Sequence, residues 1–219
     1  LFKSFNNIKY YPPIISLSST LNTLLASYYS KNINREYLSK YLKLNDGGEI
    51  LVDIYNINQN ENNNKPKIIS LILPGNHGST KSSYVIRNII ESLKYNFPIF
   101  IYNKRGIYSE LKTLKTFNAI DYNDIHEICL YIKSLYPNYK IIATAYSIGG
   151  VQLTKYLTNE NNLISYSLIV STIIDYFNLH KVNIKYNDFL IEYFLIKTAK
   201  NYYYNNKKIF EDNNINIID

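Results

Sequence analysis

A serine set between small residues is the part of this sequence best suited to covalent chemistry. The segment reads Ala145, Tyr146, Ser147, Ile148, Gly149, Gly150. A serine hydroxyl held on a sharp turn can attack a carbonyl carbon when a base accepts its proton. Such a turn needs small residues two positions before and two positions after the serine, so that the strand and the helix can approach closely. Ala145 and Gly149 meet this requirement, and Gly150 adds a second small residue.

The neighbours of Ser147 allow two interpretations. The apolar run from Lys140 to Ala145 predicts a strand and Ile148 to Leu157 predicts a helix, so the serine falls at a strand-to-helix junction. In one interpretation Ser147 is only an N-cap residue. In the other it is a nucleophile, because amides at the start of a helix favour the negative charge that develops during acyl transfer.

A second glycine loop lies two predicted strands upstream of the serine. The strand from Lys67 to Leu73 runs into Pro74, Gly75, Asn76, His77 and Gly78. An amide from a loop in this place can stabilise the oxyanion of an acyl-transfer intermediate. We therefore expect the amides of Asn76 and Ile148 to form an oxyanion hole. The expected supporting and lining residues are Gly75, Gly78, His77 and Tyr146.

Predicted strands alternate with predicted helices along the chain. Strands are expected over residues 49–55, 67–73, 98–102, 140–145 and 164–170, and helices over 82–95, 121–136, 148–157 and 186–204. This alternation predicts βαβ units and a mostly parallel sheet flanked by helices. With the serine turn and the glycine loop, it predicts the α/β-hydrolase fold as a single domain over residues 1–219, with the C-terminal strands of that fold missing.

Several segments carry a family resemblance that extends over nearly the whole chain. They are residues 20–24, with Thr20 where the family has histidine; the Asp-Gly-Gly turn and strand of 44–53; the Leu-Pro-Gly loop of 73–79 followed by Ser83 and Tyr84; the Asn-Lys-Arg-Gly of 103–106; residues 113–117; and Asp175. Together they resemble the YheT-like branch of abhydrolase-domain esterases and acylglycerol lipases. The resemblance implies a serine hydrolase of carboxylic esters or lipids, with residues 178–205 as the start of a helical lid.

Arg105 stands ahead of Gly106 at the end of a predicted strand. It could position substrate, and would then line the site. It could instead tie down a loop, because the guanidinium presents a rigid fork of hydrogen-bond donors. The fork geometry favours the structural role.

Charge and composition exclude some classes of function. The formal charge is +7, but the lysines are scattered and no nucleic-acid motif is present, so we expect no nucleic-acid partner. Association with an anionic membrane surface stays open. The single cysteine, Cys129, excludes an internal disulfide and Cys-x-x-Cys metal patterns, and we expect neither a metal nor a cofactor. The sequence does not determine the compartment: an N-terminal anchor outside this chain would hold the protein at a membrane, and without one it would be cytoplasmic.

The base and the acid of a catalytic triad are not identified. His77 and His126 precede the serine, and His180 follows it too early for a base carried on a later strand. Two interpretations stay open: a piece of a longer active hydrolase, or a degenerate protein that keeps the fold and binds without catalysis. We favour the first and expect the 219-residue chain alone to be inactive.

Overall fold

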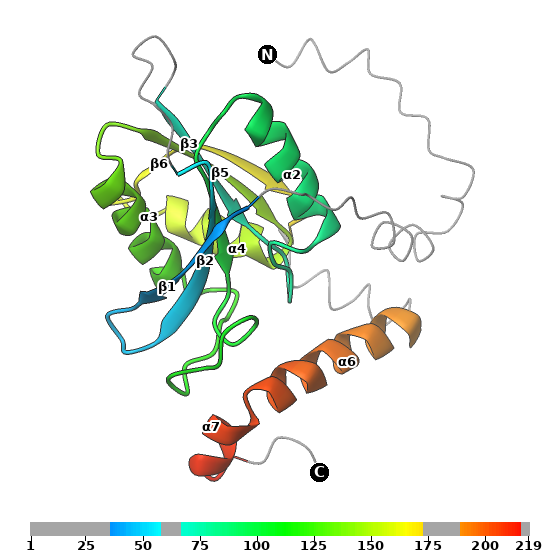
Figure 1. Ribbon diagram of the computed structural model, residues 1–219. Helices are drawn as coiled ribbons and strands as arrows, with labels where there is room; N and C mark the ends of the chain where they lie inside the picture. The colour runs from blue at the N-terminus through cyan, green and yellow to red at the C-terminus, as the bar shows by residue number, and fades with distance from the viewer. Residues whose placement is uncertain (1–35, 58–66, 173–188, 216–219) are drawn as a thin grey trace, which may run out of the picture.

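A twisted sheet of six strands organises the protein (Figure 1). The computed structural model describes residues 36–57, 67–172 and 189–215. Their strands are β1 (Leu38–Lys43), β2 (Glu49–Tyr55), β3 (Ile68–Leu73), β4 (Ile99–Asn103), β5 (Lys140–Tyr146) and β6 (Ile164–Val170), in the order β1-β2-β4-β3-β5-β6. The strands β4, β3, β5 and β6 are parallel, whereas β2 pairs antiparallel with both β1 and β4.

Helices cover both faces of this sheet. Figure 1 shows α2 (Ser83–Lys94) on one face, with α3 (Asn123–Leu135) and α4 (Ile148–Leu157) on the other. Alternate residues of each strand supply the two faces. In β4, Ile99 and Ile101 pack toward α2, while Phe100 and Tyr102 pack toward α3 and α4. Because both faces are covered, the central strands β3, β4 and β5 are mostly apolar and do not alternate between apolar and polar residues.

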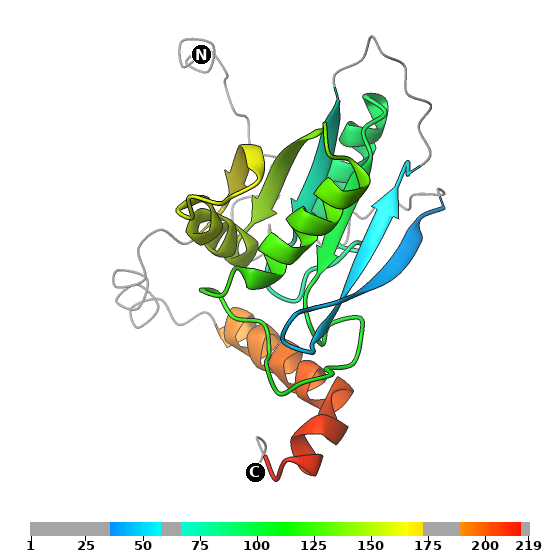
Figure 2. The same cartoon turned by 90° about the vertical axis from the view of Figure 1, so that its left-hand side faces the viewer.

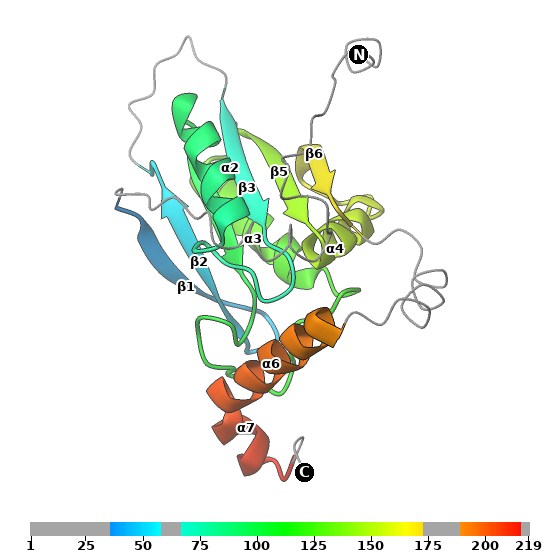
Figure 3. The same cartoon turned by 90° about the vertical axis from the view of Figure 1, so that its right-hand side faces the viewer.

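Two further helices lie beyond the carboxyl ends of the parallel strands. Figures 2 and 3 show α6 (Phe189–Asn205) crossing this edge of the sheet, followed by the short α7 (Lys207–Asp212). The buried Asn206 between them accepts a hydrogen bond from the Leu111 amide and donates to the Gly106 carbonyl, both at 2.8 Å. Tyr202 donates to the Arg105 carbonyl at 3.1 Å. These bonds attach α6 to the loop after β4.

The expected elements are largely confirmed. The five predicted strands are present within a residue of their expected ends, and so are the helices of residues 82–95, 121–136 and 148–157, the second beginning two residues late. The edge strand β1 and the helix α7 were not predicted. Residues 20–24, Asp175, His180 and the part of the expected lid before Phe189 lie outside the described residues.

Candidate active site

Ser147 occupies the junction of β5 and α4 in a strained conformation. Its φ is 50° and its ψ is −120°, a region that residues other than glycine rarely adopt. Its side chain makes no capping hydrogen bond to α4. The N-cap interpretation is therefore wrong for the hydroxyl, because the serine begins the helix without using its side chain to cap it. The strained residue is thus one whose side chain has a single functional group, the hydroxyl.

Gly149 allows the turn to be this sharp. A Cβ at this position would lie 2.5 Å from the Pro74 carbonyl oxygen and 2.7 Å from that of Leu73. The start of α4 thus packs directly on the backbone that follows β3. On the other side, the Ser147 amide donates to Val170 at 3.0 Å, and Thr172 donates to the Ser147 carbonyl at 3.0 Å. The elbow is held from both neighbouring strands.

The glycine loop and the serine meet at one edge of the sheet. The strands β3 and β5 are adjacent and parallel, with Leu73 opposite Ala145, so the residues that follow them emerge side by side. A Cβ on Gly75 would lie 3.3 Å from the Cβ of Ser147. The amide of Gly75 is already occupied, since it donates to the Tyr84 hydroxyl at 3.0 Å. The next amide along the loop belongs to Asn76.

The amides of Asn76 and Ile148 are the candidate oxyanion donors. Neither amide has a hydrogen-bond acceptor among the described residues. Asn76 is exposed and is followed by His77, whose φ is 49°, in a turn closed by a 3.1 Å bond from the Gly78 amide to the Gly75 carbonyl. Gly78 packs against the Tyr84 hydroxyl, leaving no room for a side chain. Amides without an acceptor beside a serine could stabilise an oxyanion.

Lys104 supports this loop from beneath, a role that we did not predict. Its side chain is fully buried at the end of β4. The ammonium donates to the carbonyl oxygens of Pro74 and Gly75 at 2.5 and 2.7 Å. Burial lowers the pKa of Lys104 from 10.5 to about 7. The sequence signal that could have predicted this role is a charged residue directly after β4, whose first four residues are apolar.

A buried carboxylate fixes the far end of the same loop. Asp53 on β2 accepts hydrogen bonds from Thr80 at 2.5 Å and from Asn103 at 2.9 Å, and Asn103 in turn accepts from the Thr80 amide at 3.1 Å. Ser39 of β1 donates to the second oxygen of Asp53. The segment from Pro74 to Thr80 is therefore anchored at both ends to neighbouring strands, which keeps its amides in place.

The side-chain hydrogen bonds of Arg105 go to two carboxylates and not to this loop. Its guanidinium donates to Asp124 through Nε and Nη2 at 2.8 and 2.6 Å, and to Asp46 at 3.0 and 2.8 Å. Burial by itself lowers the pKa of Arg105, but its hydrogen bonds to Asp124 and Asp46 reverse the direction and raise it. The residue ties the β1–β2 turn to the start of α3. Among the described residues its side chain makes hydrogen bonds to Asp46 and Asp124, and none to Ser147 or the glycine loop.

Tyr146 and the two described histidines have different neighbours. Tyr146 packs against Tyr84 and accepts a bond from Asn88 at 3.1 Å. The ring of His77 packs edge-on against those of Phe117 and Tyr202, which also contact each other. The pKa of His77 is lowered by burial and by the charge of Lys104. His126 is on α3, with Nδ1 3.2 Å from the Tyr156 hydroxyl. Neither described histidine is hydrogen-bonded to Ser147.

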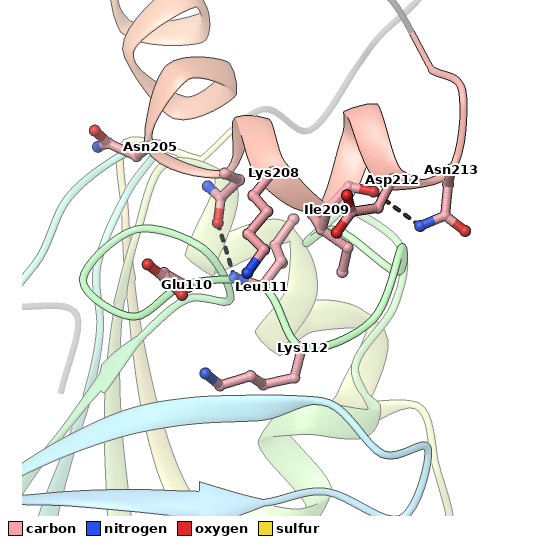
Figure 4. A pocket seen from close by; sticks show the side chains of 9 residues that line it. Glu110, Leu111, Lys112, Asn205, Lys208, Ile209, Asp212 and Asn213 are labelled. Carbon is pink, nitrogen blue, oxygen red and sulfur yellow. Dashed lines mark hydrogen bonds between the residues drawn. The ribbon is translucent and has the colours of Figure 1, made fainter.

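Two cavities lie near α6. One of about 310 Å³ adjoins the glycine loop and is lined by His77, Gly106, Ile107, Tyr108, Thr198, Asn201, Tyr202 and Asn205. The other, of about 290 Å³, lies between α7 and the loop after β4 (Figure 4), where Leu111, Ile209 and several charged and amide side chains surround it. The second cavity contains no serine, cysteine or histidine, so only the first is placed to serve chemistry at the elbow.

Within residues 36–57, 67–172 and 189–215 the structure contains no group of His, Cys, Asp and Glu side chains suited to a metal ion. In the same ranges no helix has the length and apolar character needed to cross a bilayer.

The six-stranded mixed sheet, the elbow after β5 and the loop after β3 define the α/β-hydrolase fold. Solved structures agree. The esterase Pf2001 of Pyrococcus furiosus superposes with a TM-score of 0.55 at 18% identity, over 73% of this chain and 59% of that one. An alpha-beta serine hydrolase homologue from Coxiella burnetii gives 0.50 at 12% identity, over 67% of each chain. At these identities the likeness concerns the fold alone.

Sequence relatives are more specific. The chain is 30% identical to mouse phospholipase ABHD3 over 153 residues, which cover 68% of this chain and 37% of the mouse protein. It is 32% identical to a monoacylglycerol lipase of Saccharomyces cerevisiae over 124 residues, 54% of this chain and 27% of the yeast protein. The matched segments thus span between about a quarter and little more than a third of the length of these relatives. No family model matches it. It belongs to the α/β-hydrolase superfamily.

Proposed function

We propose that the protein hydrolyses carboxylic esters, as an esterase or acylglycerol lipase, through an acyl intermediate on Ser147. The observation that carries the proposal is the backbone of Ser147, with φ at 50° at a strand-to-helix junction and a hydroxyl that does not cap the helix. Holding a serine in such a region costs on the order of 1–3 kcal/mol. A strained serine beside two free amides is suited to acyl transfer.

In the proposed reaction the Ser147 hydroxyl attacks the ester carbonyl and its proton passes to a base. The carbonyl oxygen becomes an oxyanion, which the amides of Asn76 and Ile148 stabilise. Collapse of this intermediate expels the alcohol, which takes up the proton, and leaves the acyl group on Ser147. Water then releases the acid by the same steps. The base and its acid partner come from residues other than the described histidines, since neither is hydrogen-bonded to Ser147.

A lipid-like ester is the proposed substrate class. Two relatives are named a phospholipase and a monoacylglycerol lipase, and both names denote hydrolysis of esters in lipids. The cavity of about 310 Å³ beside His77 adjoins the proposed oxyanion hole and offers space for part of such a substrate. Association with a membrane surface would follow from a lipid substrate and is proposed with it.

A fluorophosphonate probe, which reacts covalently with activated serines, tests the proposal. We expect it to label the natural-length protein and to fail with Ser147→Ala, while the exposed Ser167→Ala is labelled like the wild type. Turnover of a panel of monoacylglycerols, phospholipids and short-chain esters would then define the substrate. A folded natural-length protein that is neither labelled nor active on any ester would refute the proposal and favour a noncatalytic binding protein.

The 219-residue chain alone is proposed to be inactive, because the described residues offer Ser147 no base. The same probe checks this. If the chain alone is labelled, a His180→Ala variant would show whether the one histidine outside the described residues supplies the base.

A further inference from the structure

A buried lysine without a carboxylate partner lies beneath the loop that carries Asn76. The ammonium of Lys104 makes two short hydrogen bonds, to the carbonyls of Pro74 and Gly75. No described aspartate or glutamate forms an ion pair with it. An unpaired buried charge is costly, and a neutral donor could tie down a loop at less expense. Anchoring of the loop therefore does not explain why the donor at this position is a charged lysine.

The explanation lies in the peptide unit that Lys104 contacts. The carbonyl of Gly75 and the amide of Asn76 belong to one planar trans peptide, so they point in opposite directions. A cation fixed on the carbonyl side therefore turns the Asn76 N–H toward the other side of the loop. Hydrogen bonds in a chain polarise one another, and those made by a charged donor are about twice as strong as neutral ones.

We propose that Lys104 is a positioning residue whose positive charge orients and polarises the Gly75–Asn76 peptide, which strengthens the Asn76 amide as an oxyanion donor. The inference rests on the proposed function of Ser147 and Asn76. A role as the base is not supported, because both hydrogen bonds of the ammonium go to carbonyls and none goes to Ser147. The rings of Tyr102 and Phe117, centred 5.7 and 6.0 Å from the Lys104 nitrogen, help to keep water from the charge.

The charge of Lys104 changes near neutral pH, because burial lowers its pKa to about 7. The titratable groups around it behave differently. The pKa of His77 is lowered by burial and by Lys104, while burial raises the pKa of Tyr84, Tyr102 and Tyr202. Between about pH 6.5 and 9, Lys104 is thus the described group at this loop that gains or loses a proton. The donor strength of Asn76 should fall as the pH rises through this range.

Nuclear magnetic resonance on the wild-type protein tests the coupling directly. We expect the ¹³C shift of the Gly75 carbonyl and the ¹⁵N and ¹H shifts of the Asn76 amide to titrate together, with a midpoint within about one unit of pH 7. Lys104→Met and Lys104→Gln should make these shifts flat over the same range, and the control Lys94→Met, which alters an exposed lysine, should not. Flat shifts in the wild type, or a titration that persists in Lys104→Met, would overturn the inference.

The rate of probe labelling tests the consequence for Ser147. At about pH 6.5, Lys104→Met should label about tenfold more slowly than the wild type, since a weakened oxyanion donor costs less than a deleted one. Lys104→Arg keeps a charge that does not titrate, so its rate relative to the wild type should rise with pH. An unchanged rate in Lys104→Met would refute the role. If wild-type Ser147 is not labelled at all, the proposed function fails, and the titration of Asn76 still decides whether Lys104 acts on the loop.

Discussion

Gly149, at the start of α4, lies against the carbonyl oxygen of Pro74. Pro74 directly follows β3, the strand next to β5 in the sheet. A Cβ added to Gly149 would come within 2.5 Å of that oxygen. The clash would be between this Cβ and a backbone oxygen, so no change of side-chain rotamer can relieve it. Through this contact the elbow that presents Ser147 and the loop that carries Asn76 have a fixed separation.

Gly149→Ala should therefore destabilise the protein strongly. Overpacking a tight site costs about 1–3 kcal/mol, and we expect a loss at the upper end of this range because the clash is with backbone. Gly75→Ala is the matched control, since its Cβ would meet the Cβ of Ser147 at 3.3 Å. Its cost in the free energy of unfolding, measured with urea, should be clearly smaller. Equal costs for the two variants would contradict the argument.

The ion pair of Arg105 and Asp124 is buried on both sides, with the two side chains only 2% and 8% exposed. Asp124→Asn should lower the free energy of unfolding by about 3 kcal/mol, because it leaves a buried guanidinium without its main counter-charge. Glu91→Gln breaks the exposed pair with Lys94 and should cost less than about 1 kcal/mol. Urea denaturation measures the free energy of unfolding of both variants. Equal losses would show that Asp46 alone is a sufficient counter-charge for Arg105.

Asn206, directly after α6, is hydrogen-bonded to the loop after β4, which is far from it in the sequence. Asn206→Ala removes its bonds to Leu111, Gly106 and Tyr202, and the first two leave buried backbone groups unsatisfied. We expect the Leu111 amide to exchange with deuterium at least about tenfold faster, because each lost bond is worth about 1 kcal/mol. The control Asn213→Ala, whose side chain bonds only the Ile209 carbonyl on the surface, should leave this amide unchanged. Unaltered exchange in Asn206→Ala would show that apolar contacts hold α6.

The central strands and the elbow could be predicted because their signals are local. Apolar runs of strand length alternate with helical periodicity, and the few glycines of this chain mark the turns that need them, as Gly75 and Gly149 show. The edge strand β1 was missed because most of its residues are exposed and its apolar residues, Leu38, Tyr41 and Leu42, do not alternate with polar ones. Its position follows from pairing with β2, which is a property of the sheet.

The supports of the site were harder to predict because they link residues far apart in sequence. Lys104 contacts the carbonyl of Pro74 thirty residues earlier, and Asp53 bonds Asn103 fifty residues later. Neither pair has a spacing that a motif could reveal. A charged residue after an apolar strand, or an aspartate within one, shows that a buried polar partner is needed without identifying the partner.

Tyr84 is a support that can be tested without altering the loop itself. Its hydroxyl accepts the Gly75 amide at 3.0 Å. Tyr84→Phe should cost about 1 kcal/mol in the free energy of unfolding, and should slow probe labelling of Ser147 about tenfold, since a small displacement of catalytic groups lowers rates sharply. Tyr95→Phe, which alters an exposed tyrosine, should change neither. A stability loss with normal labelling would make Tyr84 a structural residue only.

Lys104 should also make the free energy of unfolding depend on pH. Its pKa is about 7 in the folded protein, whereas the ordinary value of 10.5 applies to the unfolded chain. Between these two pH values the unfolded chain holds a proton that the folded protein has released. Stability rises with pH wherever the unfolded state binds more protons. The free energy of unfolding should therefore increase between about pH 7 and 9.5, below the range where tyrosines titrate, by an amount on the order of a few kcal/mol. Lys104→Met should remove this slope and Lys94→Met should keep it. A wild-type stability that is flat or falls over this range would mean that Lys104 keeps its proton in the folded state.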